Sequence, residues 1–305
     1  MVIAAPQSMT LVSRTSTGGI ADFASLGSSL SADGQVIVFE SYATNLVSSD
    51  TNNASDVFVR DMRTGTIERV SLSSSGIQGN HHSRIPAISA DGRFVVFRSL
   101  ANNLVPGDWN VHEDIFLRDR AVGVTMLVSA SSTGAQANQD CISASVSGDG
   151  RYIAFESSAS NLVPGDINNV ADIFVHDSWT HQTTAVSVTP AGVTGNQVCR
   201  YTSISHDGRY VAFQSSASDL VAGDTNGVAD IFVRDLLLGT TERVSLGSAG
   251  QQAAAACVAP SISGNGRFVS FEGSAANLVP GDTNFTTDVF VHDRVLQTTV
   301  RVQTS

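Results

Sequence analysis

Hydrophobic and polar residues alternate along the chain in short runs that are separated by turn residues. Residues 141–187 show the pattern well. The alternating runs there are Cys141–Ser147, Arg151–Ser157, Asp172–Asp177 and Thr183–Ser187. Alternation over so few residues is typical of β-strands, and an Asp-Gly pair between two runs is typical of a hairpin. The pattern predicts four antiparallel strands, which we name A to D in chain order, and it shows no helical periodicity.

The same pattern recurs along the whole chain at a constant period. Copies of the segment Asn161–Asp177 begin at Asn45, Asn103, Asn161, Asp219 and Asn277, each 58 residues after the last. We therefore expect a single domain over residues 1–305, with units at approximately 14–71, 72–129, 130–187, 188–245 and 246–303. Four antiparallel strands repeated radially describe a β-propeller. The predicted fold is all-β, a five-bladed propeller with one unit per blade.

Phenylalanine occupies one position in every B strand and one in every C strand. These residues are Phe39, Phe97, Phe155, Phe213 and Phe271, and Phe58, Phe116, Phe174, Phe232 and Phe290. Equivalent apolar positions in stacked sheets are expected to face one another, so these ten side chains are predicted to form the core.

Three motifs connect the repeat with a known family. In the fourth unit they are Ser-x-Asp-Gly-Arg-Tyr-Val-x-Phe (Ser205 to Phe213), Asp-Ile-Phe-Val-x-Asp (Asp230 to Asp235) and Gly-Thr-Thr-Glu-Arg-Val-Ser (Gly239 to Ser245). They resemble the WD40-like repeat of TolB-type propellers, and the resemblance covers essentially the whole chain. It implies a blade fold and a role as a binding platform, and it brings no common catalytic motif. The loop between strands B and C is longer here than a minimal repeat needs.

The ends of the chain contain one copy of strand D too many. Thr10–Ser13 aligns with Glu68–Ser71, and Val300–Gln303 aligns with Glu242–Ser245, so strand D has six copies whereas strands A, B and C have five. One terminal segment must complete the last blade. We expect the N-terminal segment to be the closing strand.

The charge and the cysteine content limit which partners the protein can bind and whether disulfides can hold its fold. The chain has 28 acidic and 17 basic residues, a net charge of −11 and three cysteines. Nucleic-acid binding requires clustered positive charge and is therefore not expected, whereas bound cations are compatible with this balance. An odd number of cysteines excludes a fully disulfide-paired scaffold, and Cys141, Cys199 and Cys257 are expected to be buried thiols.

No apolar stretch is long enough for a membrane span, and Met1–Ala5 is too short for a signal peptide. The chain is therefore either cytoplasmic or a mature fragment of a protein located outside the cytoplasm, and we favour an extracytoplasmic or secreted monomer.

The B–C loop contains the strongest candidate site, an acidic motif of the form Asp-x-Asn-x-x-x-Asp. Its residues are Asp50, Asn52 and Asp56; Asp108, Asn110 and Asp114; Asp166, Asn168 and Asp172; Asp224, Asn226 and Asp230; and Asp282, Asn284 and Asp288. Alternate oxygen-bearing positions in a tight loop suit calcium, which takes six to eight oxygen ligands. The complete EF-hand pattern is absent. The alternative is that Asp and Asn form Asx-turns and that the last Asp tethers strand C.

A second candidate site is the channel mouth, where the D–A loop enters strand A and the units differ most. The residues concerned are His81, His82, Arg84, Asp140, Arg200 and Tyr201. Together they would provide acid–base groups and arginines for an anionic or sugar-like ligand. The alternative is a hydrated rim that binds no ligand. His81 and His82 are not expected to share a metal, because neighbours on a strand point to opposite faces.

These features favour a non-enzymatic binding or scaffolding propeller with calcium in its B–C loops and a protein or glycan ligand. The rival hypothesis is a carbohydrate-active enzyme, a polysaccharide lyase or glycosidase, with its site at the channel mouth. A glycosidase requires paired carboxylates, and only Asp140, with Asp22 near it in register, qualifies there. His176 and His292 replace an arginine found in other units, and we expect them to lie on the surface.

Overall fold

The computed structural model describes residues 10–284 and 286–302, and the strands in this part of the chain form five sheets of four. The first two sheets contain β1 (Ser25–Leu30), β2 (Val36–Ser41), β3 (Asp56–Asp61) and β4 (Ile67–Arg69), then β5 (Ser83–Ile88), β6 (Phe94–Ser99), β7 (Asp114–Asp119) and β8 (Val124–Leu127). The third and fourth contain β9 (Cys141–Val146), β10 (Tyr152–Ser157), β11 (Asp172–Asp177) and β12 (Gln182–Ala185), then β13 (Cys199–Ile204), β14 (Tyr210–Ser215), β15 (Asp230–Asp235) and β16 (Thr240–Arg243). The fifth contains β17 (Cys257–Ile262), β18 (Phe268–Gly273), β19 (Asp288–Asp293) and β20 (Thr298–Arg301).

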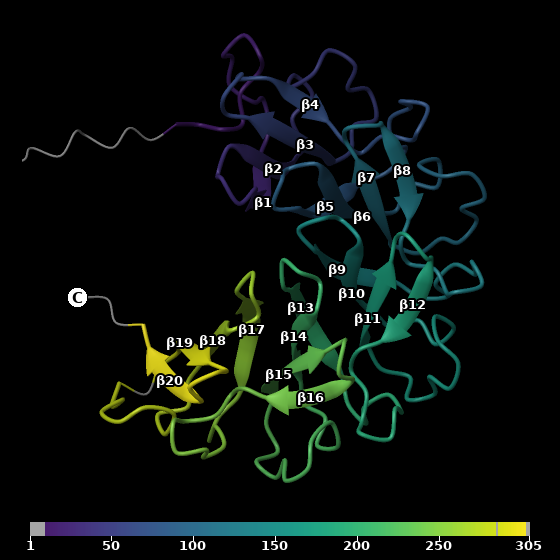
Figure 1. The fold of residues 1–305 in the computed structure, drawn as a ribbon. Helices are drawn as coiled ribbons and strands as arrows, with labels where there is room; N and C mark the ends of the chain where they lie inside the picture. The colour runs from purple at the N-terminus through teal and green to yellow at the C-terminus, as the bar shows by residue number, and fades with distance from the viewer. Residues whose placement is uncertain (1–9, 285, 303–305) are drawn as a thin grey trace, which may run out of the picture.

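Each sheet is one blade, built from four antiparallel strands that are consecutive in sequence. Figure 1 shows the blades arranged along an arc, with strand A of each blade on the inside and strand D on the outside. The predicted all-β, five-bladed propeller is confirmed. Between β20 and β1 the arc is open (Figure 1).

The ten phenylalanines of strands B and C form the core, as predicted. All are at most 3% exposed, and within each blade the strand B ring lies beside the strand C ring, as in Phe155 and Phe174 with centroids 5.7 Å apart. The remaining core residues join neighbouring blades. Val57 and Val59 of blade 1, for example, belong to the same buried cluster as Phe97 of blade 2. Burial of apolar surface between blades therefore stabilises the arc.

The Ser-x-Asp-Gly-Arg motif locks the A–B turn onto strand C. In blade 3, Ser147 Oγ donates a hydrogen bond to Asp149, and Arg151 makes a bidentate pair with Asp177, with Nη2 2.7 Å from Oδ2 and Nε 3.1 Å from Oδ1. Gly150 has φ 73°, a conformation that a side chain would strain. The motif is thus structural, and it is one of the three motifs that carry the family resemblance.

The prediction that the N-terminal segment completes the last blade is wrong. β20 (Thr298–Arg301) is the fourth strand of the fifth sheet, so the C-terminal copy of strand D fills that position. Gln303 lies outside the described residues. Thr10–Ser13 lies instead beside blade 1, where Val12 packs against a cluster that contains Phe39 and Phe58.

His176 and His292 are also not where we expected them. Both are buried, at 2% and 1% exposure, and the Nδ1 of each lies 2.9 Å from a threonine hydroxyl of strand D, Thr183 or Thr299. In blade 2 the same position is Arg118, whose guanidinium reaches Thr125 and the carbonyl oxygen of Ser73. The position joins blades, and a histidine substitutes for the arginine inside the protein.

Candidate functional site

The B–C loop of each blade lies against the following D–A loop. In blade 1, Asn52 Nδ2 donates to the carbonyl oxygen of Gly79 at 2.8 Å, and the Ser55 amide donates to His82 Nδ1 at 2.9 Å. The Asn contact recurs in blades 2, 3 and 4. Both long loops therefore share one face of the propeller, as expected from the order of the strands.

The third residue of the acidic motif anchors strand C. In blade 3, Asp172 Oδ1 accepts a hydrogen bond from Ser187 at 2.6 Å, and its Oδ2 accepts one from Asn168 Nδ2 at 2.7 Å. Asn168 Oδ1 in turn accepts the amide of Val170, which is an Asx-turn. The asparagine presents its donor side to the carboxylate and is not placed as a cation ligand.

The same arrangement holds Asp56 with Asn52, Asp114 with Asn110 and Asp230 with Asn226. In blade 5, Asn284 accepts the amide of Thr286. The turn-forming role that the sequence left open for these residues is therefore present in the structure.

The first Asp of the motif meets an arginine of strand D in three of the five blades. Arg243 Nη1 lies 2.8 Å from Asp224 Oδ1 and 3.5 Å from Asp230 Oδ2. Blade 5 repeats this with Arg301 against Asp282 and Asp288, at 2.8 and 3.4 Å, and blade 1 with Arg69 against Asp50 and Asp56, at 3.4 and 3.5 Å. In these blades a guanidinium neutralises the two carboxylates.

Blades 2 and 3 lack this arginine, since the equivalent positions are Leu127 and Ala185. Their carboxylates are nevertheless buried: Asp108 and Asp166 are each 6% exposed. Asp108 Oδ1 has no hydrogen-bond donor among the described residues, and Asp166 Oδ1 has a hydroxyl, that of Thr194, at 3.4 Å. Each of these blades thus holds a buried carboxylate pair that is not neutralised by an arginine.

The pKa values of these carboxyl groups are raised chiefly by burial, and no arginine lowers them in blades 2 and 3. The pKa of Asp114 and of Asp172 is raised to about 6, mainly by burial; the neighbouring carboxylates of Asp108 and Asp166 add to this rise and the hydrogen bonds oppose it. Burial also raises the pKa of Asp108 and of Asp166. A divalent cation would relieve both the burial cost and the repulsion.

An ion would have access to the blade 2 pair. Asp108 lines a pocket of about 420 Å³ together with Gly107 and Trp109. Across residues 10–284 and 286–302, no three His, Cys, Asp or Glu side chains gather closely enough to hold a metal alone. A cation between Asp108 and Asp114 would therefore complete its shell with backbone carbonyl oxygens and water, as calcium commonly does.

The candidate residues of the channel mouth are distributed over several blade junctions. His82 and Arg84 lie beside Tyr42 of blade 1, with the Arg84 guanidinium 5.6 Å from the ring centre, and His81 is exposed. Asp140 contacts His112 at 3.2 Å and accepts the amide of Glu113 at 3.0 Å. Burial lowers the pKa of His82, and Arg84 and His81 lower it further.

Arg200 and Tyr201 line a pocket of about 490 Å³ between blades 4 and 5, together with Gln214 and Glu272. Asp22 bonds to Thr44 of its own blade, while Asp140 belongs to blade 3. The two carboxylates proposed as a glycosidase pair therefore have separate partners.

A row of polar side chains on strand B was missed by the sequence analysis. Its members are Glu40, Arg98, Glu156, Gln214 and Glu272. Glu156 is buried, accepts the amide of Tyr201 at 3.2 Å and has its pKa raised by that burial. Glu40 similarly accepts the amide of Ile85 at 2.7 Å. The signal was a polar residue directly after the core phenylalanine in every unit. Glu40 and Glu156 thus join their blade to strand A of the next blade at the inner wall.

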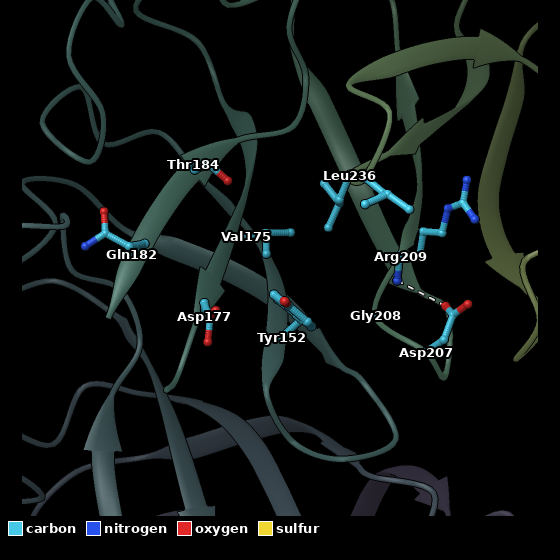
Figure 2. Close-up of a pocket in the computed structure, with 10 residues that line it drawn as sticks. Tyr152, Val175, Asp177, Gln182, Thr184, Asp207, Gly208, Arg209 and Leu236 are labelled. Carbon is cyan, nitrogen blue, oxygen red and sulfur yellow. Dashed lines mark hydrogen bonds between the residues drawn. The ribbon is translucent and has the colours of Figure 1, made fainter. Parts of the chain in front are cut away.

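A further pocket lies on the side of the A–B and C–D turns, between blades 3 and 4 (Figure 2). It measures about 450 Å³ and is lined by Tyr152 and Val175 on one side and by Leu236 and Arg209 on the other. Figure 2 shows the Tyr152 ring and Leu236 facing the same space, while Asp207 holds the turn by accepting the Arg209 amide.

The solved structures that resemble this chain are propellers. TolB from Acinetobacter baumannii has 16% sequence identity and a TM-score of 0.52, and the match covers 92% of this chain and 54% of that one. The putative TolB from Agrobacterium tumefaciens has 15% identity and a TM-score of 0.55, with 92% and 80% covered. The fold is that of a TolB-like β-propeller.

The β-propeller domain of the Trilobed protease from Pyrococcus furiosus matches this chain at 11% identity with a TM-score of 0.54, over 93% of this chain and 72% of that one. No family model matches the sequence. The comparison with curated protein sequences finds no match either. At these identities the likeness shows the fold, and this propeller spans about half of the Acinetobacter TolB. Within the described part of the propeller, no helix has the length and apolar character of a membrane crossing.

Proposed function

We propose that this propeller is a non-catalytic binding or scaffolding module whose B–C loops in blades 2 and 3 hold calcium. One observation carries the calcium proposal. Three blades place an arginine between the two loop carboxylates, whereas the two blades without it keep the carboxylates just as buried. Buried charges that are not compensated cost several kcal/mol each. A bound cation at Asp108 and Asp166 supplies what the arginine supplies elsewhere.

Calcium suits these loops because they offer oxygen atoms alone. Two carboxylates balance its charge, and one oxygen of Asp114 and of Asp172 already serves a serine. Few charged ligands imply a weak site, with a dissociation constant on the order of 10⁻⁴ to 10⁻³ M, the range of extracellular calcium modules. This affinity agrees with an extracytoplasmic location, which we propose for the protein.

The binding role is supported by the surface formed by the C–D turns. Large apolar side chains are exposed there in four consecutive blades, namely Val122, Trp179, Leu237, Leu238, Val295 and Leu296. Leu237 also lines the pocket between blades 3 and 4 (Figure 2). Exposed apolar side chains around a pocket are typical of protein-binding surfaces. We propose that a protein ligand contacts this face of a monomeric propeller.

Selection of displayed random peptides on the immobilised propeller tests this surface. Peptides enriched on the wild type should lose binding to a Trp179→Asp, Leu237→Asp variant and keep it with a Trp109→Asp control on the opposite face. Equal binding of these peptides to the wild type and to the Trp179→Asp, Leu237→Asp variant would contradict the proposed surface.

The non-catalytic role is tested separately with glycans. Turnover of a glycan by the wild type, lost in Asp140→Ala, would contradict it.

Arginine substitution tests the calcium proposal. In a Leu127→Arg, Ala185→Arg variant, blades 2 and 3 acquire the countercharge of the other blades. We expect calcium to raise the melting temperature of the wild type and to leave that of the variant unchanged, because binding to the native state alone stabilises it.

The matched control is Asp224→Asn in blade 4, which removes a carboxylate already paired with Arg243 and should leave the calcium response intact. A calcium response of equal size in wild type and arginine variant would rule out these sites. So would the absence of any response in the wild type up to ~10 mM calcium, well above the expected dissociation constant.

A further inference from the structure

The four internal blade junctions are built from the same positions. Strand C and the residue after strand D of one blade present apolar side chains to strands A and B of the next. At the junction of blades 4 and 5, Ile231, Val233 and Val244 pack against Ile262 and Phe271, and all five are at most 8% exposed. The first three form what we call the exit face of a blade, and the last two belong to the entry face of the next blade.

Blade 5 has an exit face that packs against no other blade within the described part of the chain. Val289 and Val302 occupy the positions of Ile231 and Val244, yet they are 44% and 51% exposed, while their counterparts in blade 4 are 0% exposed. Their backbone is in the usual place, since the Val302 amide donates to the Val289 carbonyl oxygen at 2.8 Å as Val244 does to Ile231. The face is formed and has no neighbouring blade among the residues that the structure describes.

Blade 1 has an entry face that is only partly covered. Leu30 is 58% exposed, whereas Ile88, Ile204 and Ile262 at the same position are 7 to 8% exposed. Leu30 lines an apolar pocket of about 360 Å³ together with Leu26, Phe39 and Val12. The two uncovered faces border the open part of the arc between β20 and β1 (Figure 1).

Residues Thr10–Ser13 already occupy the strand D position beside this entry face. Val12 packs on the Phe39 cluster as Val70 packs on the Phe97 cluster one blade further on. The following backbone also repeats: Arg14 bridges to Ile20 as Leu72 does to Gln78, and Arg60 reaches the Arg14 carbonyl oxygen as Arg118 reaches that of Leu72. Thr10–Ser13 thus take the place of strand D of a preceding blade, and residues 10–284 and 286–302 contain no strands A, B and C for that blade.

We propose that the opening between blade 5 and blade 1 is a docking site for a three-stranded A–B–C sheet of the same repeat, which takes Thr10–Ser13 as its fourth strand. Its A and B strands cover Val289 and Val302, and its C strand covers Leu30. Direct contact of blade 5 with blade 1 is disfavoured, because Val302 would have to enter the place held by Val12. Blade 5 of a second copy meets the same obstacle. Only a sheet without its own strand D fits.

The first test measures the exposure of the two faces in the chain as it is. Cysteine replaces Leu30 or Val289, and the rate of thiol labelling is compared with that of Trp109→Cys on the B–C loop side. The native cysteines are buried and their thiol pKa is raised to about 12, so they give little background. We expect both faces to label as fast as the control. Protection of either face in a monomer or in a dimer would overturn the proposal in favour of direct closure or of a second copy.

The second test supplies the missing sheet. A copy of residues 190–239, appended after Ser305, continues the repeat and provides strands A, B and C of blade 4. We expect a monomer in which labelling at Leu30→Cys and Val289→Cys is slowed at least about tenfold, the level expected for a closed interface, and in which the melting temperature rises.

The matched control carries aspartate at the appended copies of Ile231 and Val233 and should restore fast labelling at Leu30→Cys. Unchanged labelling in the unmodified extension would contradict the proposal. The calcium sites are in blades 2 and 3, so the outcome does not depend on them.

Discussion

Two buried histidines between the blades are expected to make the stability of the protein depend on pH. His176 lies near His181 and Asp177 and has Thr183 within hydrogen-bonding distance. Its pKa is lowered to about 4, mainly by burial and to a smaller extent by His181. The neutral imidazole occupies the place that the Arg118 guanidinium occupies in blade 2, and burial disfavours the protonated imidazole.

We therefore expect the free energy of unfolding to fall as the pH is lowered from about 6.5 towards 4. The unfolded chain binds the proton near pH 6.5, and the folded chain resists it until about pH 4, so the contribution of His176 is complete above pH 6.5 and is lost below it. A shift of this size corresponds to a loss on the order of 1–3 kcal/mol. Urea titrations between pH 7 and pH 4.5 measure it.

The matched variant is His176→Arg, which places at this position the residue that blades 1, 2 and 4 use. Its stability should fall less over the same pH range, since arginine does not titrate there. An identical pH dependence in wild type and variant would show that other groups dominate. His292, whose pKa is also lowered by burial, is the second contributor and is substituted next.

These histidines show what a residue pattern leaves open. A position that is arginine in some units and histidine in others is typical of a protein surface. Its burial at a blade junction follows from the packing of one blade on the next, which the sequence pattern does not show. One position of strand D shows the opposite case, because its variation between arginine and an apolar residue was visible in the sequence. The residues there are Arg69, Leu127, Ala185, Arg243 and Arg301. The role of this arginine could be recognised only from the structure, in which its side chain points into the acidic loop.

At the scale of the element, the A–B turn and strand C of a blade behave as one unit. Arg151 pairs with Asp177 and also stacks on Tyr152 and Trp179, with its guanidinium carbon 4.7 Å from each ring centre. The pKa of Asp177 is lowered to about 2, with the Arg151 hydrogen bond and the backbone amides of Trp179 and Thr180 outweighing the opposing effect of burial.

Asp177→Asn should consequently destabilise the protein by about 1–3 kcal/mol, the cost of removing one partner from a charged hydrogen-bonded pair. Asp61→Asn is the matched control. Blade 1 has Gln35 in place of the turn arginine, and Asp61 pairs with Arg63, which is largely exposed. Surface pairs contribute little, so the control should lose less than about 1 kcal/mol. Equal losses in urea unfolding would contradict the coupling of turn and strand.

The elements themselves were well predicted because their signals are local. The expected strand at Asp172–Asp177 is β11, and the expected strand at Cys141–Ser147 is β9, one residue shorter. The alternating pattern, the Asp-Gly turn and the paired phenylalanines all indicate the same strands, and this agreement makes the strands of a repeat predictable from its sequence. The acidic loop was located correctly, but its five copies looked equivalent, and the structure divides them into three with an arginine and two without.

At the scale of the molecule, the open arc was not predicted. Periodicity specifies how many blades there are, but whether the last meets the first depends on the rotation between blades, to which no single residue corresponds. The surplus copy of strand D was the available signal, and we assigned it to the wrong blade. Its position beside blade 1, with Val12 on the Phe39 cluster, instead defines the vacant A–B–C positions.

The most direct test of the account is a crystal structure grown with millimolar calcium, with anomalous diffraction used to locate the ions. The account predicts calcium between Asp108 and Asp114 and between Asp166 and Asp172. It predicts none in blades 1, 4 and 5, where Arg69, Arg243 and Arg301 lie against the carboxylates. Calcium in all five loops, or in none, would contradict it.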